Sequence, residues 1–176
     1  MKKIENYENI RDFSDVSLPV GPQPCKITDV IDHPDKSYLE VRFDIDSGEF
    51  KGFYKNMFEK NGVWRGTIIR SYKESALGFF KAFITAVEKS NTNYSWLAND
   101  WNEKSLIGKY VIVNFREEEY LAENNEIKTS IKPFEFRSIQ AWKEGKIQTP
   151  KKLEIERNTI TESSTLPDIS DEDVPW

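Results

Sequence analysis

Apolar and polar residues alternate along several short stretches of the chain, which is the pattern of half-buried β-strands. The clearest predicted strand covers residues 38–45, where every second residue is apolar. Its apolar face is formed by Leu39, Val41, Phe43 and Ile45. A weaker alternation predicts a first strand over 25–31, and we expect Pro22 and Pro24 to prevent pairing before it because proline lacks an N–H donor. We interpret residues 50–58, which follow a DSGE turn, as a third strand.

One segment shows the apolar spacing of a helix instead. Between Ser71 and Lys89, apolar residues recur three or four positions apart, so that they line one side of a helix. These residues are Leu77, Phe80, Ile84 and Val87, with Phe83 beside them. Ser71 followed by Glu74 fits a capping box, and we therefore expect the helix to begin there.

Two further strands are predicted after the helix, over residues 106–121 and 127–139, with ENNE as the hairpin loop between them. Pro133 in the last strand is expected at an edge or a bulge. The resulting order of three strands, a helix and two strands predicts a mainly β fold, a five-stranded OB-fold-like barrel with a helix between strands 3 and 4. A different small α+β sheet with one covering helix has the same order of elements and stays an alternative.

The chain of 176 residues has the length of one folded domain with a tail. Residues 1–20 are polar and form an N-terminal arm, and residues 21–153 hold the OB-like domain. Residues 154–176 lose the apolar periodicity and are rich in Thr, Ser, Pro and acidic side chains, so we expect a disordered, flexible acidic tail.

Charge is strongly segregated along the chain. The totals, 25 basic and 30 acidic residues, give a net charge of −5, which excludes a uniformly basic nucleic-acid-binding protein. Residues 158–176 contain five acidic residues and no Lys or Arg, so they account for the whole deficit. By contrast, residues 51–73 and residues 128–152 each carry a net charge of +5.

The sequence has no pattern typical of an enzyme, a cofactor site or a metal site. The single histidine, His33, lies in a DHPDKS turn, and the single cysteine, Cys25, lies in the first predicted strand. We interpret the run from Glu117 to Glu119 as the solvated end of a hairpin. No apolar run is long enough to span a membrane, and the start of the chain lacks the apolar stretch of a signal peptide, so a soluble, cytoplasmic protein is expected.

The two basic stretches also contain aromatic residues. Single-stranded nucleic acid requires this combination, because cations follow the phosphates while flat rings stack against unpaired bases. The candidate phosphate-binding residues are Lys51, Lys55, Arg65, Arg70, Lys132, Arg137 and Lys143. The candidate base-stacking residues are Phe53, Tyr54, Trp64, Phe134 and Trp142.

Strand alternation would gather some of these residues on shared faces. On the third predicted strand, Lys51, Phe53 and Lys55 point to one side. The corresponding face of the fifth predicted strand holds Lys132, Phe134 and Phe136. An aromatic ring between cations on one face is the arrangement that base stacking needs.

The chain closes with an acidic run followed by an aliphatic residue, proline and tryptophan. An extended peptide of this kind, with a terminal ring and carboxylate, suits binding in a partner's basic pocket, and its charge also attracts the protein's own basic stretches. The partner-binding residues predicted in this tail are Asp171, Glu172, Asp173, Val174, Pro175 and Trp176.

Three segments resemble a family of phage-encoded proteins that are generally assigned as single-stranded DNA-binding proteins of phage replication and recombination modules. They are RSYKESALGFFKAFITAVEKSN, LIGKYVIVNFREEEYL and KTSIKPFEFRSIQAWKEGKIQTPK, from Arg70 to Lys151. The ending DISDEDVPW is similar to the acidic tips of bacterial and phage single-strand-binding proteins, with Trp176 where those tips have Phe.

The resemblance implies sequence-independent binding of single-stranded DNA in the cytoplasm of an infected bacterium, without a cofactor. It also implies a tail that recruits phage or host replication and recombination proteins, and it is compatible with a homo-oligomer. An alternative from another class is a protein-interaction adaptor or inhibitor of host machinery, built on the same barrel and without DNA binding.

Overall fold

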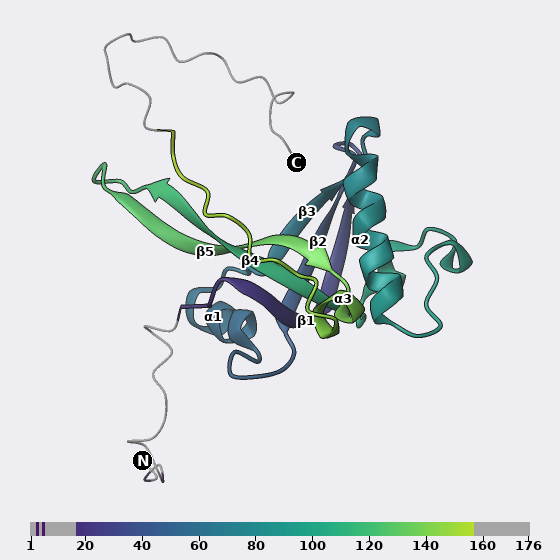
Figure 1. The fold of residues 1–176 in the computed structure, drawn as a ribbon, viewed down its shortest axis with the longest axis horizontal. Helices are drawn as coiled ribbons and strands as arrows, with labels where there is room; N and C mark the ends of the chain where they lie inside the picture. Colours follow the sequence, from purple (N-terminus) through teal and green to yellow (C-terminus); the bar gives the residue numbers. More distant parts are fainter. Residues whose placement is uncertain (1–2, 4, 6–16, 157–176) are drawn as a thin grey trace.

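The computed structural model describes residues 3, 5 and 17–156. Its strands form one antiparallel five-stranded sheet in the order β3-β2-β1-β4-β5 (Figure 1). The strands are β1 (Gly21–His33), β2 (Tyr38–Ile45), β3 (Thr67–Ser71), β4 (Tyr110–Leu121) and β5 (Ile127–Arg137). The helices are α1 (Phe53–Asn61), α2 (Leu77–Ser90) and α3 (Ile139–Lys143), with short 3₁₀ turns at Glu74–Ala76, Leu97–Asn99 and Glu103–Leu106. The predicted mainly β class, and a helix between strands 3 and 4, are confirmed. Within the described residues β3 and β5 do not pair, so the sheet is open.

The core lies between the sheet and α2. All four residues of the apolar face predicted for residues 38–45 are at most 4% exposed, which confirms that strand as β2. The Phe43 ring lies edge-on to the rings of Phe115 and Phe136, so β2, β4 and β5 meet at one point in the core. From α2, Phe83 and Val87 complete the contact. None of the described helices is both long and apolar enough to cross a membrane.

β1 pairs with two neighbours along its length. Its first residues, 21–26, pair with β4, and residues 25–33 pair with β2. The expectation that Pro22 and Pro24 prevent pairing is therefore wrong. The carbonyl oxygen of Pro24 accepts a hydrogen bond from the Asp46 N–H at 2.9 Å, so the backbone polar groups of Pro24 face the β2 side. Because Pro22 has the same parity, neither proline removes a hydrogen bond to β4.

The third predicted strand, residues 50–58, is also wrong, because most of it is helical. Phe53, Tyr54 and Met57 follow the i, i+1, i+4 spacing of one helix face, and that face packs on the body of the protein. The strand that pairs with β2 is instead β3, in the basic segment that follows.

Two glycines and one distant carboxylate fix the limits of α1. Gly52 and Gly62 flank the helix with φ angles of 72° and 70°, a backbone region that favours glycine. The Asp44 carboxylate, on β2, accepts hydrogen bonds from the backbone N–H groups of Tyr54 at 2.9 Å and Lys55 at 3.0 Å. A strand residue therefore caps the helix, and its charge is favourable beside the helix N-terminus.

The main predicted helix exists, but it begins later than expected. Ser71 pairs with Tyr38 as the last residue of β3, so it belongs to the sheet. Its hydroxyl accepts a hydrogen bond from the Lys73 N–H at 3.2 Å, and the chain then passes through a 3₁₀ turn before α2 begins at Leu77. Because Ser71 is paired within β3, it does not cap α2.

The β4–β5 hairpin projects from the body of the molecule (Figure 1). Its predicted loop is confirmed, since the Ala122 N–H donates to the Glu126 carbonyl at 2.9 Å. The register passes from Asn114–Glu135 to Phe115–Pro133, so that Phe134 is left without a partner in the ladder. The expectation of an edge or bulge at Pro133 is thus confirmed: β5 is an edge strand with a bulge beside this proline.

After α3 the chain returns alongside β4. Leu153 exchanges backbone hydrogen bonds of 2.9 Å with Glu117 and Glu119, and Lys152 Nζ lies 3.1 Å from the Glu119 carboxylate. The Glu119 side chain is only 5% exposed. On the other side of the strand, Glu118 pairs with Arg116 at 2.7 Å. The interpretation of this glutamate run as a solvated hairpin end is therefore wrong, because the returning segment covers it.

Candidate nucleic-acid interface

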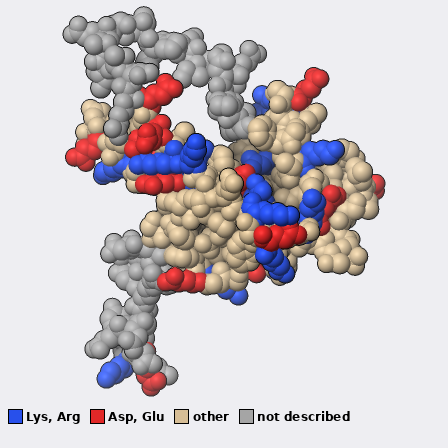
Figure 2. All heavy atoms as spheres, viewed as in Figure 1, with Lys and Arg blue, Asp and Glu red and all other residues tan. Residues whose placement is uncertain are grey.

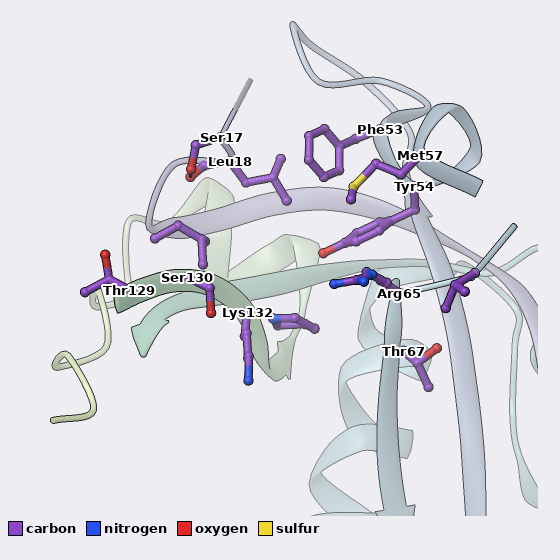
Figure 3. Close-up of a pocket in the computed structure, with 13 residues that line it drawn as sticks. Ser17, Leu18, Phe53, Tyr54, Met57, Arg65, Thr67, Thr129, Ser130 and Lys132 are labelled. Atoms are coloured by element: carbon purple, nitrogen blue, oxygen red, sulfur yellow. Dashed lines mark hydrogen bonds between the residues drawn. The ribbon is translucent and has the colours of Figure 1, made fainter. Parts of the chain in front are cut away.

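A groove of about 740 Å³ lies between α1, the start of β3 and β5 (Figure 3). The apolar residues that line it are Leu18, Phe53, Met57, Val63 and Ile131. The polar residues that line it include Tyr54, Arg65, Thr67, Thr129, Ser130 and Lys132. Four of the residues proposed from sequence, two from α1, one before β3 and one from β5, therefore line the same groove.

Tyr54 and Arg65 both point into the space between α1 and β5 (Figure 3). Tyr54 is 4% exposed, and burial raises the pKa of its hydroxyl, so the group stays a neutral hydrogen-bond donor. Arg65 is exposed and forms no ion pair with any residue in the described part of the chain. Its guanidinium is thus available to an anionic ligand.

Lys132 contributes differently from what the sequence suggests. It lines the groove, but Figure 3 shows its Nζ directed away from Tyr54 and Arg65. The Nζ lies 3.6 Å from Glu118, the carboxylate that also holds Arg116. Figure 2 shows basic and acidic side chains next to one another along this hairpin. The positive charge of Lys132 is therefore partly neutralised within the protein.

Phe134 and Phe136 do not share a face, in contrast to the prediction. Phe134 is 39% exposed, with the Arg116 guanidinium 4.1 Å from its ring centroid, and Arg116 and Lys132 converge on the same carboxylate. Phe136 is 5% exposed and packs in the core against Phe83, with ring centroids 4.6 Å apart. The bulge at Phe134 explains the difference, because one extra residue reverses the in–out alternation of a strand.

Trp64 packs behind the residues that line the groove. Its indole Nε1 donates to the Gly66 carbonyl at 3.0 Å, and its ring centroid lies 6.4 Å from that of Tyr54 and 6.1 Å from that of Phe58. The indole is half-buried behind Tyr54 and α1. It fixes the position of the groove wall and is not itself among the lining residues.

Two of the candidate arginines are occupied by contacts inside the protein. The Arg70 guanidinium on β3 lies 5.1 Å from the centroid of the Phe136 ring on β5, and burial lowers the pKa of Arg70 to about 10. Arg137 lies 3.6 Å from Glu135. Arg70 therefore joins the two edges of the open sheet, and Arg137 has a carboxylate partner of its own.

The remaining candidates lie around the groove or away from it. Lys51 precedes α1 and Lys55 lies on it; both are exposed, and neither forms an ion pair with a described residue. Trp142, 40% exposed, and Lys143 lie on α3, which contributes no residue to the groove. The candidate tail, from Asp171 to Trp176, lies outside the described residues.

Sequence reasoning missed part of the apolar lining of the groove, especially Met57 and Val63. A signal for it exists in the chain. The apolar residues of 53–58 are spaced as on a helix, and Gly52 and Gly62 bracket the segment at the two positions where a helix ends. Among known proteins, no family model matches this sequence, and no curated protein matches it significantly.

Proposed function

We propose that the protein binds single-stranded DNA, without sequence preference, along the groove between α1, β3 and β5. One observation carries the proposal: the two stretches of net charge +5, residues 51–73 and 128–152, are far apart in sequence and yet supply opposite walls of one groove. The groove offers the Arg65 guanidinium, which has no ion-pair partner among the described residues, together with hydroxyl groups and aromatic rings. A single strand can use all three, because its phosphates, sugars and bases are exposed together.

The strand order supports an OB-type barrel as the scaffold. β1 is shared between β2 and β4, which leaves β3 and β5 as the two edges of the sheet. The contact between Arg70 and Phe136 brings these edges close together, as in a partly open barrel. OB-folds bind oligonucleotides on the face around strands 2 and 3, and here the first residue of β3, Thr67, lines the groove.

In this proposal Arg65 binds a phosphate directly, and Lys51 and Lys55 follow the DNA backbone along α1. The half-buried Phe53 and the exposed Phe134 stack with bases, at about 1–3 kcal/mol for each stacked base. Tyr54 donates a hydrogen bond from its protonated hydroxyl to the bound DNA strand. Together these contacts read the backbone and the flat faces of the bases, which is why no sequence preference is expected.

The biological setting follows from the resemblance of residues 70–151 to phage single-stranded DNA-binding proteins. We propose a role in phage DNA replication or recombination, with the acidic tail as the segment that recruits other proteins of that process. The tail's aliphatic-Pro-Trp ending supplies the apolar contact, and its acidic run selects a basic pocket on the partner.

The test is a fluorescence-anisotropy titration of labelled oligo-dT and of a matched duplex, at low and at high salt. We expect tight binding of the single strand and weak binding of the duplex. If about four phosphates are neutralised, the logarithm of the affinity falls with the logarithm of salt with a slope near −3. Affinity that does not depend on salt contradicts the electrostatic part of the proposal.

Two variants locate the site. Arg65→Ala should weaken oligo-dT binding by about five- to thirtyfold, the equivalent of about 1–2 kcal/mol for one charge-assisted contact. The matched control is Lys89→Ala, which removes an exposed cation on α2, outside the groove. An equal effect of both variants would mean that binding is not confined to the groove, and no binding of the wild type would favour the adaptor alternative.

A further inference from the structure

Beside α2 the surface carries a second hollow region, in which none of the groove residues described above takes part. Two adjoining cavities, of about 330 and 410 Å³, share Leu77, Phe80, Trp96 and Trp101. The two tryptophans come from the connection between α2 and β4, which projects beyond α2 in Figure 1. We call this region the α2 groove.

The α2 groove exposes large apolar side chains. Trp101 is 66% exposed, and Leu97 and Leu77, which line the same region, are 65% and 48% exposed. Trp101 stands next to the buried Trp96, with ring centroids 6.1 Å apart. A contiguous patch of this kind, with a tryptophan at its centre, is typical of a surface that binds another protein.

The rim of the α2 groove is acidic. Three carboxylates line it, from Asp32, Glu88 and Glu103, against one cation, Lys81. Asp32 accepts a hydrogen bond from the Tyr72 hydroxyl at 2.8 Å, and Glu88 accepts one from the backbone N–H of Trp96 at 2.9 Å. Both donors are neutral. Within the described part of the chain none of the three carboxylates forms an ion pair, so their charge is not cancelled.

We propose that the α2 groove binds a basic amphipathic helix of a partner protein. The apolar face of that helix packs on Leu77 and Trp101, and its Lys or Arg side chains lie beside the acidic rim. A helix laid in an apolar groove presents its anchors at the i, i+3, i+4 spacing, and complementary charge along the rim sets its orientation. This proposal is independent of DNA binding.

The acidic rim also argues against other occupants. The segment 158–176 of this chain carries five acidic residues and no basic one, so the rim repels it, and it repels the phosphates of DNA in the same way. A second copy bound through the same face would bring the two acidic rims together, because a two-fold interface pairs each patch with itself. A cationic partner helix is the occupant that both the apolar and the charged groups favour.

The test uses the full-length protein and a fluorescein-labelled amphipathic helical peptide made of Leu and Lys, with a Leu/Glu peptide of the same spacing as the control. Anisotropy in moderate salt should show binding of the Leu/Lys peptide alone. Trp101→Ala should weaken that binding at least tenfold, and Glu103→Lys should weaken it as well. Lys81→Glu, which removes the only cation of the rim in the described structure, should tighten it.

The matched control is Leu121→Ala, which removes a 59% exposed apolar side chain at the far end of the β4–β5 hairpin. Every variant keeps the acidic segment after residue 157, so a general attraction of the cationic peptide is the same in all of them. Unchanged oligo-dT binding and an unchanged melting temperature of Trp101→Ala show that the fold is intact.

Three results overturn the proposal. Equal peptide binding by Trp101→Ala and Leu121→Ala places the contact elsewhere. Equal binding of the Leu/Glu peptide rules out recognition of cations. A wild-type dimer in sedimentation equilibrium that Trp101→Ala converts to a monomer assigns the α2 groove to a second copy of this chain.

Discussion

Gly66 lies where the backbone before β3 passes closest to the core. A Cβ atom there would overlap the Phe43 carbonyl oxygen and lie 2.7 Å from the Tyr54 ring, whereas a Cβ at Gly78, inside α2, would have no neighbour within 4 Å. We predict that Gly66→Ala lowers the free energy of unfolding by about 1–3 kcal/mol through overpacking. Gly78→Ala should raise it by about 0.5–1 kcal/mol, because alanine favours a helix. Urea denaturation of both variants measures the two effects, and the same sign for both would contradict this account.

Cys25 should make the stability of the protein fall at alkaline pH. The residue is 1% exposed, and burial raises the pKa of its thiol well above the usual value. In the unfolded chain the thiol ionises near pH 8.5, while the native thiol keeps its proton. The free energy of unfolding is therefore highest below that pH and decreases above it, by up to about 1.4 kcal/mol per pH unit.

The measurement is urea denaturation under reducing conditions between about pH 7 and pH 10. Cys25→Ala is the matched variant: it should be less stable at neutral pH because it leaves a cavity, but its stability should depend less on pH. The native thiol should also react with a thiol reagent only on unfolding. Identical pH dependence of the wild type and the variant would show that Cys25 is not the group responsible.

At the scale of elements, α1 depends on a residue that lies on a strand. Asp44 accepts hydrogen bonds from two N–H groups of the first helical turn, those of Tyr54 and Lys55, and thereby positions the helix that forms one wall of the groove. We predict that Asp44→Ala lowers the free energy of unfolding by about 1–2 kcal/mol, the usual effect of losing a helix cap. It should also weaken oligo-dT binding, because Phe53 and Tyr54 lose their fixed position.

The control for Asp44→Ala is Asp46→Ala, two residues further on. The two variants remove the same charge, but the side chain of Asp46 does not cap α1. Only Asp44→Ala should affect stability and oligo-dT binding together. Loss of binding in both variants would point to the negative charge of this region and not to the helix cap.

The elements that could be predicted from sequence are those whose pattern is set within the element. β2 and most of α2 bury one face, and their apolar spacing indicates it, while the buried part of β4, residues 111–115, is a nearly continuous apolar run. The errors arise where a contact with a distant part of the chain determines the local secondary structure. α1 is capped by Asp44 from β2, and Ser71 is held in β3 by Tyr38. The sequence of a segment shows its apolar periodicity, but it does not show which distant residue that segment pairs with.

The candidate site shows the same limit. Composition identified both walls of the groove, since cations and rings cluster in the two stretches that form it. It did not identify which side chains face the groove, because the bulge at Phe134 changes the parity of β5 and ion pairs take up Lys132 and Arg137. Of the two cations that line the groove, Arg65 differs from Lys132 in having no carboxylate partner among the described residues, and this depends on tertiary structure.

For the molecule as a whole, the distribution of charge separates two surfaces. The groove between α1, β3 and β5 lies between the two stretches of net charge +5, whereas the rim of the α2 groove is acidic. A polyanion and a cationic helix would therefore be directed to different places on the same protein. We therefore expect DNA and the cationic helix to bind at the same time, with little effect of either ligand on the affinity of the protein for the other.

The acidic segment 158–176 carries the entire net charge of the chain, and we predict that it competes with DNA for the basic groove. Deleting it should tighten oligo-dT binding at low salt, and the difference should shrink as salt screens the attraction, since the Debye length falls to about 10 Å at 0.1 M. A variant in which the five acidic residues are replaced by Asn or Gln keeps the length of the segment and should behave like the deletion. Anisotropy titrations at several salt concentrations compare the three proteins. Equal low-salt affinities of the wild type and the deletion would mean that the segment does not reach the groove, and a difference between the deletion and the neutral variant would show that steric exclusion, not charge, is responsible.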